Sequence, residues 1–303
     1  MPLPDDARSV SLANDLVQQL QRIFGKHPGF RPAHAKGAMF TGTFTPATGA
    51  TSLTKAPHVS RSTTPVTARF SNSAGIPLLP DNDPNANPRG LAIRFHLAEH
   101  VHIDIVSHST DGFPTHTGSE FLEFLRAVAA SDPAKLPGSP LEAFLGSHPA
   151  ALAFVKTPKP APVSFATETY FGVNAMRFTS SAGVSRYGRY RLLPEAGRAY
   201  LDDATAPPKA ANYLFDEIAE RVAKGPVRLK LLAQIAKDGD LVDDATIHWP
   251  EDRELVELGR VELTAPVAND AQEQKRIIFD PIPRVEGSRR LRIRCSSSAP
   301  RST

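Results

Sequence analysis

The stretch Arg31-Pro-Ala-His34-Ala-Lys-Gly37 decides how this chain of 303 residues is interpreted. His34 follows a turn that contains proline, and it precedes small residues that let the backbone approach another group closely. Imidazole titrates near neutral pH, but a single histidine in such a place is more often structural than catalytic. The interpretation of His34 therefore depends on the segments around it.

The segment before this stretch is predicted to form an amphipathic helix over residues 9–25. Val10, Val17, Leu20 and Phe24 recur there at helical spacing, and a glycine ends the run. After it, between residues 38 and 106, short alternating or apolar runs are separated by Pro, Gly and Asn, which predicts successive strands. These runs are 40–44, 66–70, 91–95 and 102–106.

The second half of the chain mixes helices and strands. Capping-box spacings at Thr117–Glu120 and Ser139–Glu142 predict helices over 118–130 and 140–155. Further expected elements are strands at 175–180 and 185–192, a helix at about 210–223 and an alternating strand at 227–235. This order predicts an α+β fold with an antiparallel β-barrel or large antiparallel sheet and surrounding helices, without an internal domain boundary.

Composition narrows the classes of protein. The 28 prolines exceed the usual share of about 5% and favour short or turning segments. The net charge is only +3, and the basic cluster 284–294 lacks interleaved aromatic residues, so no nucleic-acid partner is expected. With Cys295 alone, a disulfide framework or thiolate metal site is not expected. The absence of a signal-like start or long apolar run favours a cytoplasmic protein without a membrane partner.

Three motifs that follow one another in the sequence support a functional interpretation of His34. After His34-Ala-Lys-Gly37 come Arg69-Phe-Ser71 and then Pro88-Arg-Gly90, which precedes a strand. This order resembles the distal half of the haem catalases. Later segments at 244–250, 256–263 and 277–281 are similar to those that lead to the proximal side of the haem. The chain most resembles the compact catalase-related peroxidases, which lack the C-terminal additions of full-length catalases.

The resemblance implies roles for particular residues. It implies that His34 moves the proton during peroxide heterolysis and that Ser71 orients its ring. Arg31 and Arg69 match positions that bind haem propionates, where a planar guanidinium suits a carboxylate. Two phenylalanines match aromatic positions against the haem and its channel. These are Phe113 and Phe121. Taken singly, each of these residues has an ordinary structural interpretation.

His108 departs from the family pattern. The resemblance places an asparagine that bonds the bound peroxide at this position. A histidine can still donate a hydrogen bond, but it is larger and gains charge at low pH. We therefore expect altered handling of peroxide, with peroxidase turnover favoured over rapid dismutation, and we include His108 among the expected catalytic residues.

The proximal side also departs from the family pattern. Catalase iron is held by a tyrosinate, which the resemblance places at the end of an Arg-x-x-x-Tyr motif beyond the segment at 279–281. No tyrosine follows Tyr213 in this chain, so no metal ligand is assigned. We predict a single domain over 1–287, a basic and disordered tail over 288–303, and doubtful haem occupancy.

We infer a single-base deletion or a sequencing error as the origin of the unusual tail. With codons chosen to suit, restoring one A after the codon for Gly287 gives, from Gly287 onward, GIEASADPLLEFRSAVY, which has the family's Gly-Ile-Glu start and Arg-x-x-x-Tyr end. Two alternatives stay open: that the tail is genuine, and that Cys295 acts as a thiolate ligand of haem.

The sequence therefore predicts a haem-dependent peroxidase with b-type haem. Its partners would be hydrogen peroxide or an organic peroxide and a small organic electron donor, with weak catalase activity in addition, in a monomer or small homo-oligomer. Two other functions stay open. One is an inactive, haem-free remnant of the fold, and the other is rearrangement of fatty-acid hydroperoxides.

Overall fold

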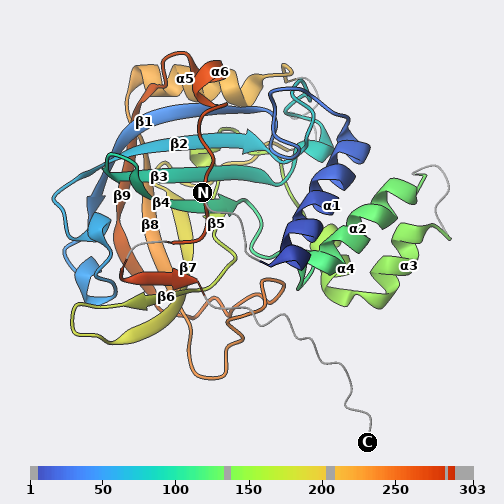
Figure 1. Ribbon diagram of the computed structural model, residues 1–303. Coiled ribbons are helices and arrows are strands. Elements are labelled where there is room, and N and C mark those ends of the chain that lie inside the picture. Colours follow the sequence, from blue (N-terminus) through green and yellow to red (C-terminus); the bar gives the residue numbers. More distant parts are fainter. Residues whose placement is uncertain (1–5, 133–137, 203–208, 284–285, 291–303) are drawn as a thin grey trace, which may run out of the picture.

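The computed structural model describes residues 6–132, 138–202, 209–283 and 286–290. Its centre is an antiparallel sheet that closes on itself (Figure 1). Eight strands follow one another around the barrel in the order β7-β5-β4-β3-β2-β1-β9-β8, and pairing between β7 and β8 closes it. Strands β6 and β10 extend the sheet beyond β7. The predicted α+β class with an antiparallel barrel is confirmed.

The strands of the barrel have the following bounds: β1 Gly37–Pro46, β2 Thr64–Asn72, β3 Arg89–Ala98, β4 Val101–His108, β5 Tyr170–Phe171, β7 Ser185–Pro194, β8 Val227–Ile235 and β9 Leu255–Pro266. The two outer strands are β6 Met176–Thr179 and β10 Ser288–Arg290. Every strand predicted from alternation is present. The pattern did not predict β5, β9 and β10.

The barrel interior is filled by side chains from alternate positions of these strands, because successive residues of a strand face opposite sides of the sheet. Phe40 and Phe70 meet edge to face at 5.9 Å between ring centroids, and Phe70 stacks on Phe165 at 5.2 Å. Phe95 and Leu229 are also fully buried in this cluster. The interior is thus a packed core, and any site must use the outer face or the ends of the barrel.

Helices lie outside the barrel. The long helices are α1 Ala7–Phe24, α2 Gly118–Ala130 and α5 Tyr213–Lys224, and the short ones are α3 Pro140–Ser147, α4 Pro149–Lys156 and α6 Asp270–Glu273. Helices α1 to α4 gather at one side of the barrel and α5 and α6 at the top in Figure 1, where α5 packs against β9. Among the described residues, no helix is both long and apolar enough to cross a membrane.

The predicted helix over 140–155 is wrong in one respect. It is divided into α3 and α4 at His148, where the backbone has ψ near 82°. The cause is Pro149, whose ring disfavours the helical conformation of the residue before it. By contrast, the capping box at Thr117 and Glu120 is present as expected.

The predicted boundary after Gly287 falls inside a paired segment. The carbonyl of Gly287 accepts hydrogen bonds from the backbone of Thr179 and from the hydroxyl of Thr54. Ser288 follows in β10 and pairs with Phe178 of β6. The remainder of the predicted tail, 291–303, lies outside the described residues, so its predicted disorder stays a prediction.

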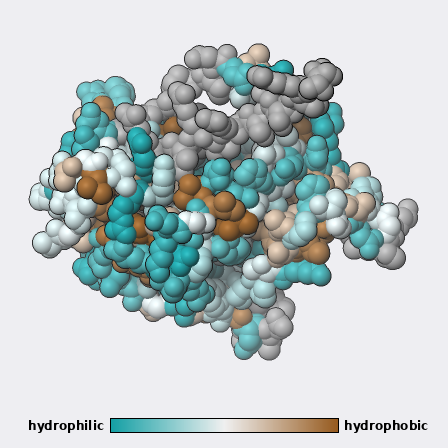
Figure 2. Space-filling view, turned by 90° about the horizontal axis from the view of Figure 1, so that it is seen from below, coloured by the Kyte–Doolittle hydropathy of each residue, from teal (hydrophilic) through white to brown (hydrophobic). Residues whose placement is uncertain are grey.

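Exposed apolar side chains are scattered. The face seen from below carries separate hydrophobic patches divided by hydrophilic residues in its described part (Figure 2). Exposed side chains of this kind include Leu78, Val184 and Leu241. Single exposed apolar residues are normal in soluble proteins, so these patches do not by themselves define a binding surface.

Candidate active site

One row of directly paired residues crosses six neighbouring strands near the start of β1. In order across the sheet, the row is Gly37, Ser71, Gly90, His108, Phe171 and Arg191. Directly paired residues project to the same face of a sheet. Because the adjacent residues Phe70, Leu91 and Tyr170 face the barrel interior, the row lies on the outer face.

The ring of His34 rests on this row above Gly90. A Cβ atom on Gly90 would lie 2.8 Å from Nδ1 of His34 and 2.6 Å from Oγ of Ser71, closer than real Cβ contacts allow. The imidazole therefore occupies the space that a side chain at position 90 would fill. Its Nδ1 lies 3.0 Å from the Ser71 hydroxyl. The structure brings His34 and Ser71 together as expected, and it places His108 on the other side of Gly90.

The backbone of His34 is held in an uncommon conformation. Its φ is 54°, in the left-handed region, where a residue with a side chain costs on the order of 1 kcal/mol or more. Its N–H donates to the carbonyl of Ser73 at 2.9 Å, and its carbonyl accepts from Nη2 of Arg69 at 2.9 Å. These two bonds fix the direction in which the ring leaves the chain.

Both histidines of the site are neutral at physiological pH. Burial is the main cause that lowers the pKa of His34 to about 3, and the positive charges of Arg69, His108 and Arg31 lower it further. Burial lowers the pKa of His108 to about 4. Each of the two residues is nevertheless only partly buried as a whole. With Nδ1–H donating to Ser71, the Nε2 atom of His34 carries a lone pair that can accept a proton.

His108 has a defined tautomer. The backbone N–H of Thr110 donates to its Nδ1 at 3.3 Å. A neutral imidazole with an acceptor at Nδ1 carries its proton on Nε2. His108 can therefore offer an N–H donor, which is the capacity that the resemblance assigned to an asparagine at this position.

Arg31 and Arg69 lie near His34, since both charges act on its pKa. Arg31 donates from Nη2 to the carbonyl of Ile277 at 2.7 Å. Arg69 is 3% exposed and donates from Nε to Gln274 at 2.8 Å. Burial is the main cause that lowers the pKa of Arg69 to about 9, which leaves the guanidinium charged at neutral pH. The arginines are thus held by the segment around α6.

Phe113 and Phe121 lie against each other, with ring centroids 4.9 Å apart. The N–H of Phe113 donates to the carbonyl of Ala245, which ties the loop after β4 to the loop before β9. Arg191, in the same row as His108, pairs with Asp111 of the first loop at 3.0 Å. The loop before β9 is held by Arg189, which is also buried, and these contacts set the position of Phe113.

Sequence reasoning missed several residues of the site. Phe171 lies beside His108 in the row and under the guanidinium of Arg191, whose centre is 5.0 Å from its ring. Arg189 is fully buried and donates to the carbonyls of Asp244 and Ile247. No short motif surrounds these residues. Gly90, which lies under His34, is in contrast part of the Pro88-Arg-Gly90 motif of the sequence.

The described residues fit one side of a haem. A histidine held over a glycine, with two arginines beside it, suits the peroxide side of a planar group that carries carboxylates. The other side needs a tyrosinate, and none of the described tyrosines lies beside Arg31 and Arg69. Tyr170, Tyr190 and Tyr213 belong to the core, and burial raises the pKa of Tyr190 and Tyr213 to about 12. The Tyr170 hydroxyl donates to the carbonyl of Phe165 and the Tyr213 hydroxyl to the carbonyl of Pro162, so both phenols are held inside the fold and are not directed at the His34 site.

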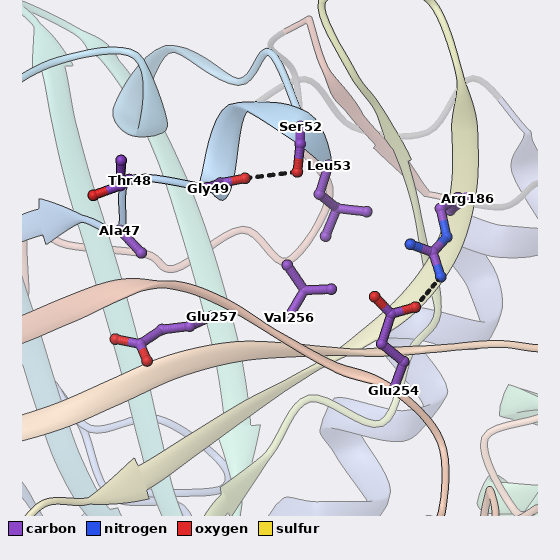
Figure 3. Close-up of a pocket in the computed structure, with 9 residues that line it drawn as sticks. All are labelled: Ala47, Thr48, Gly49, Ser52, Leu53, Arg186, Glu254, Val256 and Glu257. Atoms are coloured by element: carbon purple, nitrogen blue, oxygen red, sulfur yellow. Dashed lines mark hydrogen bonds and ion pairs between the residues drawn. The ribbon is translucent and has the colours of Figure 1, made fainter.

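A separate recess of about 590 Å³ lies at the opposite end of β1 (Figure 3). Its walls include Gly49, Leu53 and Val256, and the ion pair between Arg186 and Glu254 closes one side. No residue of the row that supports His34 lines it. It is therefore separate from the candidate active site.

Comparison with known proteins agrees with this geometry. A sequence model of the family Catalase matches residues 12–290. The chain therefore belongs to the catalase family, and it is an enzyme of the oxidoreductase class.

Its relatives include short members of that family. The chain is 33% identical to a catalase-related peroxidase of Mycolicibacterium paratuberculosis (strain ATCC BAA-968 / K-10) over 274 residues, which cover 89% of this chain and 86% of that protein. It is 31% identical to a catalase-related peroxidase of Synechococcus elongatus (strain ATCC 33912 / PCC 7942 / FACHB-805), with 89% and 80% covered.

Solved structures show the same fold. A fungal catalase superposes with a TM-score of 0.77 at 20% identity, covering 97% of this chain and 61% of that chain. A bacterial catalase gives 0.75 at 21% identity, with 94% and 57% covered. The chain thus spans about three fifths of the length of these catalases, and at this identity the likeness shows the fold alone.

Proposed function

We propose that this chain is a peroxidase of the compact catalase-related kind. Its substrates would be hydrogen peroxide or an organic peroxide together with a small organic electron donor, and its cofactor would be b-type haem. The observation that carries the proposal is the ring of His34, which lies over Gly90 with Nδ1 at 3.0 Å from the Ser71 hydroxyl. A bound haem would supply the redox chemistry that side chains lack.

The residues of the row account for the proton movements. His34 is neutral and only partly buried as a whole, so its Nε2 can take the proton from the near oxygen of a peroxide. Because the low pKa makes the protonated ring a strong acid, it returns this proton readily to the leaving oxygen. His108 would donate from Nε2 to the bound peroxide, because its Nδ1 is occupied by the Thr110 N–H.

The surrounding residues would bind and enclose the cofactor. Arg31 and Arg69 carry positive charge beside His34, which suits the carboxylates of haem. Phe113 and Phe121 form an apolar pair that would exclude water from one edge. Their side chains would make the reaction site drier and would strengthen its electrostatic interactions.

A second candidate function is a folded remnant without haem. The observation that favours it is the location of the tyrosines, since Tyr170, Tyr190 and Tyr213 are packed in the core. A chain of this kind would keep the barrel and the row but would not turn over peroxide.

One experiment separates the two functions. The chain as printed and the chain encoded after one base is restored behind the Gly287 codon are purified with haem supplied, and Soret absorbance and peroxide turnover are measured. We expect a tyrosinate-type spectrum and turnover in the restored chain, and weak or no haem in the printed one. Full haem occupancy in the chain as printed would refute the idea that it lacks the axial ligand of haem. A restored chain that binds haem but does not turn over peroxide would refute the proposed peroxidase function.

A further inference from the structure

Arg69 is held by two different parts of the chain. Its Nη2 donates to the carbonyls of His34 at 2.9 Å and Ala35 at 3.3 Å. Its Nε donates to Oε1 of Gln274 at 2.8 Å. Within the described part of the chain, the hydrogen bonds of this guanidinium come from Nε and Nη2. One edge of the guanidinium therefore supports the His34 backbone, and the Nε side is held by Gln274.

Gln274 uses both ends of its amide. While Oε1 accepts from Arg69, Nε2 donates to the carbonyl of Gly37 at 2.9 Å and to Oδ2 of Asp270 at 2.8 Å. Asp270 in turn accepts the backbone N–H of Met39 at 3.2 Å. An amide accepts at one end and donates twice at the other, whereas a carboxylate cannot donate. The contacts around position 274 therefore require glutamine specifically.

The guanidinium has little room on its other side. A Cβ atom on Gly37 would overlap Nη2 of Arg69, so the arginine packs directly against the backbone of β1. With β1 on one side and Gln274 at Nε, the side chain has one well-defined position. That position determines where the His34 carbonyl is held.

We propose that Gln274 is the positioning residue of this site, which sets Arg69 and, through Arg69, the backbone of His34 for proton transfer. The proposal rests on the proposed function for its effect on turnover. The bonds themselves concern only residues of this chain. Loss of the Gln274 amide would free the guanidinium to turn toward solvent and would release the left-handed backbone at His34.

Such a change has an electrostatic signature. The charged or titratable groups that act on His34 are Arg69, His108 and Arg31, and all three lower its pKa. If Arg69 turns away, one of these charges is removed and the pKa of His34 rises. The ratio of protonated to neutral ring at a fixed pH then increases about tenfold for each unit by which the midpoint rises.

The test uses the full chain without haem. Ring ¹⁵N shifts of His34 are followed from pH 7 to pH 4 in the parent and in Gln274→Met, which keeps the length and removes every hydrogen bond. The matched control is Gln272→Met, since Gln272 is exposed on α6, the short helix that Gln274 directly follows. We expect a neutral ring throughout in the parent and the control, and the onset of protonation in Gln274→Met. Identical shifts in all three would overturn the proposal.

A swap variant guards against general damage to the fold. Asp270→Asn combined with Gln274→Glu exchanges the amide and the carboxylate, so the new amide at position 270 can donate to the new carboxylate at position 274, which still accepts from Arg69. We expect this pair to move the ring shifts back toward the parent, although the bond to Gly37 is lost. Gln274→Glu alone sets two carboxylates against each other and should resemble Gln274→Met. A swap that is no better than Gln274→Glu alone would contradict the proposed role.

Turnover gives an independent second measurement. If the chain with the restored frame is a peroxidase, Gln274→Met should lose activity at pH 5 relative to pH 7, whereas the parent and Gln272→Met should not. An unchanged pH profile in Gln274→Met would count against the positioning role. If no chain turns over peroxide, the proposed function fails, and the ring shifts still decide the role of Gln274.

Discussion

Two buried histidines lie on opposite sides of the same barrel wall and behave differently. His34 rests on the outer face over Gly90, with a partner at Nδ1 and part of its surface accessible. His58 is 1% exposed and packs against the rings of Phe44 and Phe95, and neither of its nitrogens has a hydrogen-bond partner among the described residues. Burial lowers the pKa of both. Burial alone therefore keeps an imidazole neutral. An imidazole that can exchange a proton also needs a hydrogen-bond partner and access to a substrate.

The largest expected effect is that of removing His34 itself. In the chain with the restored frame and haem supplied, His34→Ala should lower peroxide turnover by about 10²–10⁴-fold, which is the usual contribution of a positioned acid–base group. His58→Leu should leave turnover unchanged, because that ring faces the core. Equal losses in the two variants would remove the distinction between the two faces.

The second effect concerns stability at low pH and belongs to His58. Its pKa is lowered to about 4 in the folded chain, whereas an unfolded histidine binds its proton near 6.5. Between these values the unfolded state binds more protons, so stability falls as the pH falls. This group alone should remove about 3 kcal/mol by pH 4. Urea unfolding of the parent and His58→Leu from pH 7 to 4 measures it.

In that experiment the curve of His58→Leu should be flatter by this amount. His34 and His108 titrate in both chains, so their contributions cancel in the difference. His100→Leu is the control, because the His100 side chain is 93% exposed. Parallel curves for the parent and His58→Leu would show that the interior imidazole finds a partner in solution.

The third effect tests the support under His34. Gly90→Ala would place a methyl group 2.6 Å from the Ser71 hydroxyl and 2.8 Å from the His34 ring, so the ring must move. Displacement of a catalytic group by about 1 Å can lower turnover by about 10²-fold. Gly49→Ala is the control, because nothing lies within 4 Å of a Cβ at that position. Full activity in Gly90→Ala would show that the ring is not confined there.

The smallest effect is that of the hydroxyl beside the ring. Ser71→Ala removes the hydrogen bond to Nδ1 of His34, a contribution of about 1 kcal/mol, which corresponds to roughly fivefold in turnover. Ser71→Thr keeps the hydroxyl and should retain more activity than Ser71→Ala. If both variants lose the same activity, shape rather than the hydrogen bond is the important property of residue 71.

The sequence predicted seven of the ten strands in the described residues, and most of the helices, because alternation and capping are local properties. The break before Pro149 was missed by the prediction of one helix over 140–155, although proline restricts the residue before it and so gave a local signal. Strand β5 has only two residues, Tyr170 and Phe171, which is too short for any period to appear. The pairing of β1 with β9 joins residues that are more than 200 positions apart in the sequence, and no local pattern reports such a contact.

In the candidate site too, local motifs predicted some residues, whereas contacts between distant segments were not predicted. His34, Ser71 and the two arginines came from ordered motifs, and the structure brings them together. The partners that actually hold Arg69 could not be predicted, because Gln274 lies 205 residues away in the chain. The assignment of Arg31 and Arg69 to the haem propionates stays a proposal, as does the role of His108.

The row through Gly90 links chemistry to the register of the strands. Side chains alternate along a strand, so a slip of β3 by one residue against β2 and β4 would turn Gly90 inward and place Leu91 beneath His34. A misaligned barrel would therefore be unable to seat the imidazole. Conversely, any sequence that keeps this alignment also keeps the place of residue 108 beside Gly90, so the side chain at that position can change while the strands that support it stay the same.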